Sequence, residues 1–546
     1  MNYVPTDNDL VFVPLGGTNE VGMVLGMIGH DGEWLIIDCG ITFYSSLGID
    51  ILTANPTFAS RQNSRIKGML ITHAHEDHIG AIEYLWPVLR CPVYVTPFAA
   101  AVLRQKLETK SWASKVNITE IQFEGKFSVG KFQAEAIQMA HSIPESAAFV
   151  ITTPLGTVVH AGDWRFDQTP VIGKKVNESK LEKVGKGNVL AYLGDSTNIF
   201  TPSDPSSESI IRENLLNLVK KHSDKRITIA CFASNIARAE SSILAAEKTG
   251  RKIAIVGWSL KKMFAAAQET WYLKEIPHLI DEKTAMSMPP NKVLMLCTGS
   301  QGEISSALVR IASGKHPIIK MNEDDIVFFS SRVIPGNEKS IGELHNLLAI
   351  RKVDIITSSE ENIHASGHPS RESIAKMYKL LKPKAVIPVH GEARHLIAQA
   401  HFARDSGIKH VITPHNGSII QLAGAKPEII GEVQTGKWAV DGNRMVAFEG
   451  SIMQERLKLS EQGAVFATVI TERDGIKRIE IGIIGLEERG KPFELLESFI
   501  RDEIKANFGK LQGNSSNTRT LESVVSASVA KKIGKRPIVA VHIVTV

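Results

Sequence analysis

The sequence has little cysteine and no long apolar run, and both shortages restrict the kind of protein it can be. Its four cysteines, Cys39, Cys91, Cys231 and Cys297, lie far apart and form no CxxC pair. Each sits in or beside an apolar run, so buried free thiols are expected, as in a reducing cytoplasm. No apolar stretch approaches the roughly 20 residues of a membrane helix, and residues 1–7 lack the features of a secretory signal. We expect a cytoplasmic protein without membrane association.

A strong charge of one sign is also missing. The formal net charge is +5 at pH 7, from 63 basic and 58 acidic residues. This mild excess is compatible with a polyanionic partner, although a solvated surface produces the same numbers. With 546 residues, 43% of them hydrophobic and 22% charged, the chain is expected to form about two to four ordinary globular domains.

Short apolar segments separated by glycines predominate up to about residue 205 and predict strands. The segment 34–37 is continuously apolar, which is typical of a strand buried on both faces. Further strands are predicted at 10–15, 22–28, 66–72, 92–96, 119–123, 148–153 and 157–160, with one long strand at 127–139. Because few helices interrupt them, these strands suggest two packed sheets with helices outside.

From about residue 206 strands alternate with helices, including a helix at 261–273, and this alternation predicts a parallel α/β module. It continues to about residue 412. Beyond 457, two strands, two helices and a last strand predict a small α/β domain. The expected boundaries are 1–205 and 346–445 for an interrupted first domain, 206–345 for the inserted module, 446–456 for a linker and 457–546 for the C-terminal domain.

A cluster of metal-ligand residues begins at His73. His73 and His75 point the same way in an extended segment, because side chains two residues apart share a face. Asp77 and His78 come where a helix would begin and can turn toward a second point. Surface histidines are a weak alternative, because four ligands within six residues rarely arise by chance. One short segment could therefore serve two metal ions, while Glu76 is given no ligand role.

Further candidates, His141, Asp163, His390 and Asp38, lie at the ends of predicted strands. For each residue alone, a cap or a satisfied core hydrogen bond explains its position about as well as metal ligation does. Together they favour one site, in which Asp38 would orient a ligand histidine from behind. Ordinary roles are expected for His30, His160 and His222.

The seven ligand candidates divide into two sets, and their chemistry indicates the metal. Imidazole and carboxylate ligands without cysteine suit zinc, with manganese or magnesium as alternatives. Two ions about 3.5–4 Å apart could share a hydroxide that attacks phosphorus or a carbonyl carbon. The expected sets are His73, His75 and His141 for one ion, and Asp77, His78 and His390 for the other, with Asp163 as the bridge.

The motif HxHxDH at 73–78, with Asp38 before it and His141 and Asp163 after it, resembles the metallo-β-lactamase superfamily of dinuclear hydrolases. This resemblance covers roughly residues 10–200 and implies an αββα sandwich. Members of the superfamily cleave esters, lactams, thioesters and phosphodiesters, so the resemblance alone does not choose a substrate.

Three later motifs resemble the β-CASP nucleic-acid-processing branch of that superfamily. They are GDSTN with Asp195, HASGHP with His368, and VHGE with His390. The module at 206–345 sits where that branch inserts its β-CASP domain. The implied fold class is α/β, with a metallo-β-lactamase αββα sandwich, an inserted parallel-sheet β-CASP domain and a small α/β C-terminal domain.

Four further stretches resemble ribonuclease J within that branch: residues 15–22, 141–146, 232–235 and 330–338. With the C-terminal domain, the resemblance spans nearly the whole chain, and no ligand is missing. It implies a zinc-dependent ribonuclease that hydrolyses RNA with a hydroxide between two metal ions as nucleophile. It also implies 5′→3′ exonuclease activity on 5′-monophosphate ends, endonuclease activity, and roles in rRNA processing and mRNA decay.

Catalytic roles are expected for Asp38, Asp77, Asp195 and His368. His368 would contact the scissile phosphate or protonate the leaving 3′-oxygen, with support of the 366–367 turn as the alternative. Asp195 would hydrogen-bond a ligand histidine or cap a strand end. Hydroxyls, backbone amides and a cation together suit a phosphate pocket. The expected substrate-binding residues are Ser234, Ser331, Arg332, His364, Ser366, Gly367 and His368.

Other functions stay open at this point. A small-molecule hydrolase acting on lactones or thioesters would not need the module at 206–345. A DNA nuclease could use the same motifs, and a non-catalytic RNA-binding subunit would not need the intact ligand set. By resemblance, the C-terminal domain would mediate self-association as a homodimer or homotetramer. Ribosomal or RNA-decay partners cannot be identified from the residues.

Overall fold

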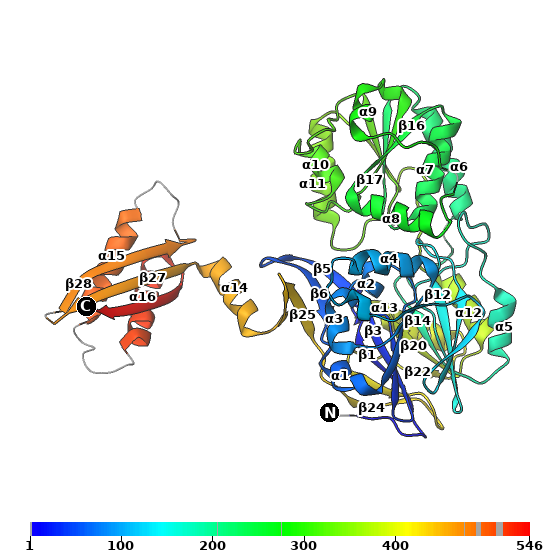
Figure 1. The fold of residues 1–546 in the computed structure, drawn as a ribbon, viewed down its shortest axis with the longest axis horizontal. Coiled ribbons are helices and arrows are strands. Elements are labelled where there is room, and N and C mark those ends of the chain that lie inside the picture. Colours follow the sequence, from blue (N-terminus) through cyan, green and yellow to red (C-terminus); the bar gives the residue numbers. More distant parts are fainter. Residues whose placement is uncertain (1–2, 205, 275, 474, 487–492, 509–516) are drawn as a thin grey trace. The chain divides into compact units, whose positions relative to one another are not determined.

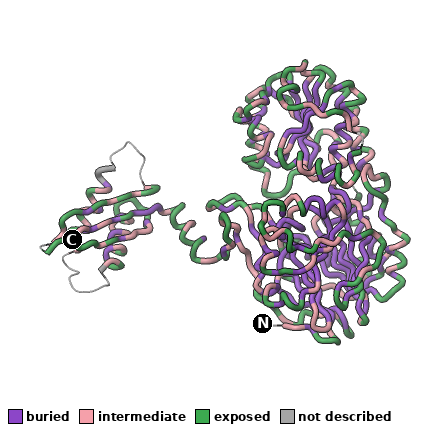
Figure 2. The backbone as a smooth tube through the Cα atoms, viewed as in Figure 1, coloured by how far each residue is buried: buried purple, intermediate pink, exposed green. Residues whose placement is uncertain are grey.

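The computed structural model describes residues 3–204, 206–274, 276–473, 475–486, 493–508 and 517–546. The chain divides into two compact units, one formed by Met1–Thr42 and Thr53–Gly436 and the other by Phe43–Leu52 and Lys437–Val546. In the first unit, buried residues concentrate in the strands (Figure 2). All four cysteines are buried and free, as expected. Among the described residues, no helix has the length and apolar character needed to span a membrane.

Two sheets packed face to face form the base of the first unit (Figure 1). The first sheet runs in the order β24 (Glu428–Glu432), β23 (Ser418–Gln421), β1 (Leu10–Gly16), β3 (Leu25–His30), β4 (Glu33–Ile37), β7 (Ile66–Leu70), β8 (Val93–Val95), β9 (Ile118–Glu120). The second runs in the order β10 (Lys126–Val129), β11 (Phe132–Gln138), β12 (Ala147–Thr153), β13 (Gly156–His160), β14 (Val189–Asp195), β20 (Ala385–Val389), β22 (His410–Val411).

Apolar side chains from the facing sides of both sheets form one core, which includes Phe12, Ile37, Phe149, Leu193 and Ile387. A second core lies between the other face of the second sheet and three helices, α5 (Glu178–Gly185), α12 (Arg371–Leu381) and α13 (Ala393–Asp405). The connections of the first sheet carry α1 (Thr57–Arg61), α2 (Glu76–Ile79), α3 (Ile82–Leu89) and α4 (Pro97–Leu107). The expected αββα sandwich is therefore confirmed.

The prediction of one long strand at 127–139 is wrong. The segment forms a hairpin of β10 and β11, in which Val129 pairs with Phe132. Gly130 makes the reversal possible because its φ of 58° is a left-handed conformation that glycine adopts easily. The apolar alternation continues through both strands, so periodicity alone did not reveal the turn.

The inserted module contains a five-stranded parallel sheet, which confirms the expected α/β alternation (green in Figure 1). The strand order is β16 (Lys252–Val256), β17 (Val293–Cys297), β15 (Arg226–Ala230), β18 (Asp325–Phe329), β19 (Asp354–Thr357). Its helices are α6 (Glu208–Lys221), α7 (Ile236–Lys248), α8 (Trp258–Glu269), α9 (Glu282–Ser287), α10 (Ala307–Ala312) and α11 (Glu338–Ile350). Helix α11 crosses residue 345, and β19 beyond it completes the sheet.

The second unit contains two sheets. One has the order β26 (Arg444–Ala447), β25 (Lys437–Asp441), β6 (Ile49–Ala54), β5 (Ile41–Ser46), and the other has the order β28 (Gly475–Ile484), β27 (Ala464–Glu472), β29 (Ile538–Thr545). Helices α15 (Phe493–Phe508) and α16 (Asn517–Ile533) pack on the three-stranded sheet, with Val465, Ile500 and Val525 in the core. The segment 446–456, expected to be a linker, contains the start of helix α14 (Ser451–Gln462).

Candidate metal centre

The candidate ligands come from strand ends that the topology brings to one edge. Strands β4 and β7 run parallel, and so do β13, β14 and β20. Strand β11 has the same direction as β13, because both run antiparallel to β12. Parallel strands end on the same side of a sheet. The residues that follow these strands therefore converge, although they are as far apart as Asp38 and His390 in sequence.

Three histidines form the first ligand group: His73, His75 and His141. Nδ1 of His75 lies 3.0 Å from Nε2 of His73 and 3.1 Å from Nε2 of His141. Burial lowers the pKa of all three rings, to about 4 for His75. The rings are therefore neutral at pH 7, which is the form that binds a metal. Their ring nitrogens lie close enough together to bind one ion.

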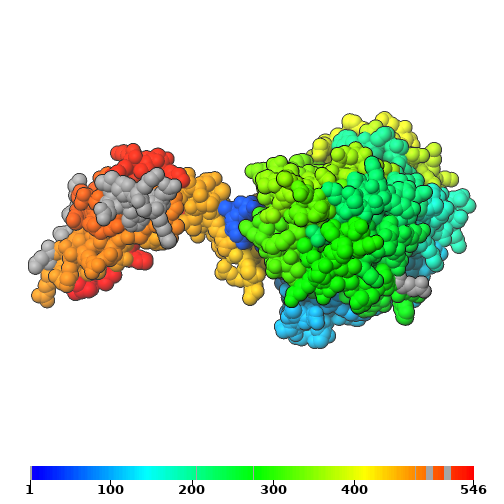
Figure 3. Space-filling model, turned by 90° about the horizontal axis from the view of Figure 1, so that it is seen from above, coloured from blue at the N-terminus to red at the C-terminus, as the bar shows by residue number. Residues whose placement is uncertain are grey.

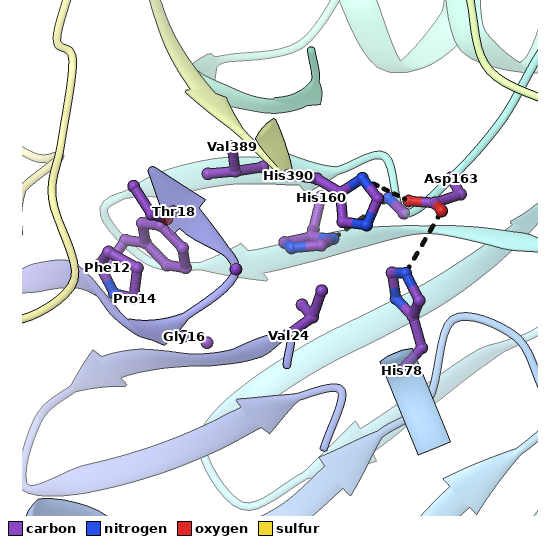
Figure 4. Close-up of a pocket in the computed structure, with 13 residues that line it drawn as sticks. Phe12, Pro14, Gly16, Thr18, Val24, His78, His160, Asp163, Val389 and His390 are labelled. Atoms are coloured by element: carbon purple, nitrogen blue, oxygen red, sulfur yellow. Dashed lines mark hydrogen bonds and ion pairs between the residues drawn. The ribbon is translucent and has the colours of Figure 1, made fainter. Parts of the chain in front are cut away.

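The second group consists of Asp77, His78, Asp163 and His390. Figure 4 shows His78, Asp163 and His390. Nε2 of His390 lies 3.3 Å from Oδ2 of Asp77, and Nε2 of His78 lies 3.3 Å from Oδ2 of Asp163. The same Asp163 oxygen is 3.9 Å from Nε2 of His73 in the first group. Asp163 therefore lies between the two groups, where a bridging carboxylate would be needed.

The electrostatics of this second group favour a positive charge. Burial alone would raise the pKa of Asp77 and Asp163, but the nearby histidines lower it, so both carboxylates are ionised. Burial alone would lower the pKa of His78, but Asp163, Asp77 and Asp38 raise it well above its usual range. Nε2 of His78 and Oδ1 of Asp163 are buried without a hydrogen-bond partner among the described residues. Ionised carboxylates and unpartnered nitrogen and oxygen atoms at one point fit a divalent cation.

Asp38 lies behind the candidate ligands and contacts His78. Its Oδ2 is 2.8 Å from Nδ1 of His78, and its Oδ1 accepts the backbone N–H of Thr72 at 2.7 Å. The turn after Asp38 needs Gly40, since a Cβ there would lie 1.6 Å from the carbonyl oxygen of Asp77. Because of this close approach, the turn after β4 packs directly against the backbone of the 73–78 segment and holds it in place.

His368 and Asp195 form a pair next to the second group. Nδ1 of His368 lies 2.7 Å from Oδ2 of the fully buried Asp195. Although burial alone would lower the pKa of His368, Asp195 raises it. The turn before His368 also holds a ligand of the first group, since the carbonyl oxygen of Gly367 accepts a hydrogen bond from Nδ1 of His141 at 2.7 Å.

The remaining expected substrate-binding residues lie around the junction of the two domains of the first unit. Oγ of Ser234, in the loop between β15 and α7, is 3.0 Å from Nε2 of His75. Ser331 is buried and accepts a weak hydrogen bond from Gln301, whereas Arg332 is exposed and donates to Oδ1 of Asn198.

Two further residues of that set lie on the segment that returns from the inserted module. Oγ of Ser366 accepts the backbone N–H of His368 at 3.3 Å. Burial, and then Arg238, Arg165 and Arg332, lower the pKa of His364 to about 3. His364 is therefore uncharged at neutral pH, and a phosphate here would meet arginine rather than a charged histidine.

Sequence reasoning missed three residues that support the site. Oγ1 of Thr72 lies 3.0 Å from Nδ1 of His73, and Oγ1 of Thr197 lies 2.8 Å from Nδ1 of His390. His160 lines the cavity beside His78 (Figure 4), and its Nδ1 accepts the backbone N–H of Gly162 at 3.2 Å. Its place at the end of β13 was the available signal. Glu76, by contrast, forms an ion pair with Lys106 at 2.7 Å.

Four family models match successive parts of the chain. Residues 33–182 match the beta-lactamase superfamily domain, and residues 224–348 match the ribonuclease J beta-CASP domain. Residues 352–414 match the Zn-dependent metallo-hydrolase RNA specificity domain, and residues 451–546 match the ribonuclease J C-terminal domain.

Full-length relatives show the same similarity. Ribonuclease J of Sinorhizobium meliloti is 36% identical, over 99% of this chain and 98% of the relative. Ribonuclease J 1 of Streptococcus pyogenes is 35% identical, over 85% of this chain and 84% of the relative. A solved structure of a protein of unknown function from Enterococcus faecalis has a TM-score of 0.54 and 16% identity, over 76% of this chain and 100% of that one. That likeness concerns the fold alone.

Proposed function

The chain belongs to the ribonuclease J family and is a metal-dependent ribonuclease, and we propose that it degrades RNA from 5′-monophosphate ends and also cuts internally. The observation that carries this proposal is the 3.0 Å contact between Oγ of Ser234 and Nε2 of His75. It joins the loop between β15 and α7 of the inserted module directly to a candidate metal ligand. Residues of the module and of the metal centre could therefore hold one polynucleotide together.

We propose two zinc ions as the metal cofactor, with manganese or magnesium as the alternatives. His73, His75 and His141 would hold one ion, Asp77, His78 and His390 the other, and Asp163 both. When bound, zinc supplies Lewis acidity toward the scissile phosphate and lowers the pKa of water, so that hydroxide is available at neutral pH. Nitrogen and oxygen donors without cysteine support zinc in this role.

His368 is the proposed proton donor to the leaving 3′-oxygen. Its Nδ1 lies against Asp195, so Nε2 is the nitrogen that can face a substrate. The negative charge of Asp195 favours the protonated ring, which is the form a general acid needs. Side-chain exposure of 24% at His368, against 0% at Asp195, supports a role for the histidine rather than the carboxylate in contacting RNA.

The proposed 5′-phosphate pocket consists of Ser331, Arg332, Ser366 and Gly367, with Ser234 and His364 beside it. Hydroxyls, a backbone amide and an arginine suit a terminal phosphate, because such donors form strong hydrogen bonds to an anion. A 5′ end bound here would fix how many nucleotides of the RNA lie between the pocket and the metal ions. That geometry would favour release of one nucleotide at a time.

For this function we propose that residues 1–205 and 346–445 form the domain that binds the metal ions. The inserted module, residues 206–345, would bind the RNA. The C-terminal domain, at 457–546 after a short connection at 446–456, would mediate self-association as a homodimer or homotetramer. The match of residues 451–546 to the ribonuclease J C-terminal domain supports treating that region as a separate module.

The decisive experiment compares hydrolysis of four substrates by the zinc-loaded protein. They are 5′-monophosphate RNA, 5′-hydroxyl RNA, DNA of the same sequence and a chromogenic lactone. Faster release of mononucleotides from 5′-monophosphate RNA is expected. Equal rates on the two RNAs would contradict the proposed pocket, and DNA or lactone as the best substrate would contradict the proposed function as a whole.

A further inference from the structure

Exposed tryptophans lie at both ends of helix α8 (Trp258–Glu269). Trp258 is 71% exposed and Trp271 is 72% exposed, whereas the other tryptophans are buried or partly buried. A lysine ammonium lies over each exposed ring, with Lys262 Nζ 4.0 Å from the centroid of Trp258 and Lys274 Nζ 4.7 Å from that of Trp271. We call these four residues the α8 platform: Trp258, Lys262, Trp271 and Lys274.

Unusual backbone conformations hold both tryptophans at the surface. Gly257, just before α8, has a φ of 116°, and a Cβ there would lie 2.3 Å from Oγ1 of Thr298. Trp271 has a φ of 68°, the left-handed conformation that commonly ends a helix, and the N–H of Tyr272 donates to the carbonyl oxygen of Ala267 at 2.8 Å. The two backbone conformations fix where α8 begins and ends, and therefore where the two exposed rings lie.

The N-terminal end of α8 lies on the same sheet edge as the candidate RNA contacts. Strands β16, β17 and β15 run parallel and are adjacent, so their carboxyl ends share one edge. Trp258 comes two residues after β16, and Ser234 comes four residues after β15. Two strand spacings, about 10 Å, separate these strand ends. Trp258 therefore lies along the edge that contacts the metal centre through Ser234.

The C-terminal end of α8 is attached to the loop that carries His141. Tyr272, next to Trp271, donates a hydrogen bond from its hydroxyl to Glu145 at 2.9 Å. Its ring also packs edge-on against Phe98 at the start of α4. Figure 1 shows α8 beside α4, and Figure 3 shows light-blue atoms, the colour of the chain near residue 100, at the edge of the green inserted module. Both ends of α8 thus adjoin segments that build the site.

The chemistry of the platform suits a single-stranded polynucleotide. Aromatic rings stack on nucleobases of any sequence, and lysines beside them neutralise phosphates. The other charges on α8 are balanced, since Lys261 pairs with Glu282 and Glu269 with Arg104. Neither platform lysine forms an ion pair with a described residue, so both charges are available to phosphate. An apolar protein partner would gain nothing from these two cations.

We propose that the α8 platform is a stacking subsite for the RNA substrate, outside the catalytic centre. Its tryptophans stack bases of the strand beyond the scissile bond, and its lysines contact the adjoining phosphates. The subsite strengthens the binding of long RNA and leaves the chemical step unchanged. It goes beyond the proposed 5′-end preference, and it requires only that the chain is a ribonuclease.

The test is steady-state cleavage of a tetranucleotide and of an RNA of about 24 nucleotides, both with 5′-monophosphate ends. Replacement of both tryptophans, Trp258→Ala with Trp271→Ala, should raise KM for the long RNA by about tenfold or more, with kcat unchanged. The tetranucleotide should be cleaved as before, because it does not reach the platform. Phe at the same two positions should restore most of the affinity, because a phenyl ring also stacks.

A second variant, Lys262→Ala with Lys274→Ala, should reduce the salt dependence of KM for the long RNA. The matched control is Ile350→Ala, an apolar residue that is 80% exposed and lies at the end of α11, away from the edge where β16 and β15 end; its kinetics should stay unchanged. Equal losses on short and long RNA, an unchanged KM in the tryptophan variant, or a similar loss in Ile350→Ala would overturn the proposal. Failure of the wild type to prefer 5′-monophosphate RNA would instead contradict the proposed 5′ pocket alone.

Discussion

Asp38 and His78 form a fully buried pair in which Oδ2 of the carboxylate lies 2.8 Å from Nδ1 of the ring. The backbone N–H of Thr72 donates to the other oxygen of Asp38, so the carboxylate cannot rotate freely. A ring whose Nδ1 is bonded in this way presents Nε2 to a metal. Asp38 therefore determines how His78 faces Asp163.

Replacement of Asp38 by Asn should weaken zinc binding by about 10–100-fold, while the chain still folds. The amide keeps the volume and one acceptor for Thr72, but it loses the negative charge next to His78. Competition with a chromogenic chelator measures the affinity. Asp31→Asn is the matched control, because Asp31 also has a left-handed backbone (φ 47°) but lies away from the site. Equal zinc affinity in both variants would contradict this role of Asp38.

Replacement of Asp163 should cost the protein more of its bound zinc than replacement of Asp77. Asp163 approaches ring nitrogens of both ligand groups, whereas Asp77 approaches those of the second group. Asp163→Ala should therefore lower the zinc content more than Asp77→Ala, because Asp77→Ala leaves the first ligand group, which contains His73, intact. Both should reduce kcat by about a thousandfold or more, since several kcal/mol of charge stabilisation are lost. Elemental analysis after desalting, beside RNA cleavage, checks this; identical zinc content in the two variants would contradict a bridging Asp163.

Strand periodicity and strand ends were sufficient to predict much of the site. The ligands follow continuous apolar strands, and parallel strands end at a common edge wherever they lie in sequence. The support given by Thr197 to His390 was not predictable, because it depends on the neighbouring order of β14 and β20. His30 and His160 are each the last residue of an apolar strand, and the tertiary structure alone places His160 in the cavity.

Helix α8 shows how a long-range contact shifts an element. The sequence predicts a helix at 261–273, whereas the structure has it at Trp258–Glu269. Its end is fixed where Trp271 turns left-handed and Tyr272 bonds to Glu145, 127 residues away in sequence. Local propensity contains no information about that contact. The difference between the predicted and the observed end of α8 therefore reflects a tertiary contact.

The proposed 5′-phosphate pocket predicts a selective loss. Ser331→Ala and Ser366→Ala should each lower the preference for 5′-monophosphate over 5′-hydroxyl RNA by about tenfold, because a hydrogen bond to a charged group contributes about 1.5–3 kcal/mol. Rates on 5′-hydroxyl RNA should change little. Single-turnover cleavage of the two RNAs measures the ratio, with Ser313→Ala as control, since the Ser313 hydroxyl donates to the carbonyl oxygen of Arg310 at the end of α10, away from the pocket. A uniform loss on both RNAs would contradict the pocket.

A buried ion pair at the base of the inserted module should be essential to its stability. Arg238, which is fully buried, lies 3.0 Å from Oε2 of Glu208 and donates to the carbonyl oxygens of Ser330 and Ile363. Arg238→Met leaves the Glu208 charge buried, so unfolding free energy should fall by about 3–5 kcal/mol. Thermal and urea denaturation measure the loss. The exposed pair of Lys352 and Glu323 should contribute less than about 1 kcal/mol when broken by Lys352→Met, and comparable losses in the two variants would contradict the prediction.

The proposed self-association through the C-terminal domain predicts a sensitive surface on its three-stranded sheet. Side chains alternate along β27, so Val465 and Ala467 pack under the helices while Phe466, 46% exposed, faces the opposite side. Ile484 and Val544 are also exposed, at 62% and 45%.

Phe466→Glu would place a charge in any interface formed there, and the dissociation constant of the oligomer should rise by about a hundredfold or more. Sedimentation velocity measures the change; Arg473→Glu, at the exposed turn between β27 and β28, is the control. If Phe466→Glu stays as associated as the wild type while Arg473→Glu dissociates, the interface lies at the hairpin end and not on the sheet face.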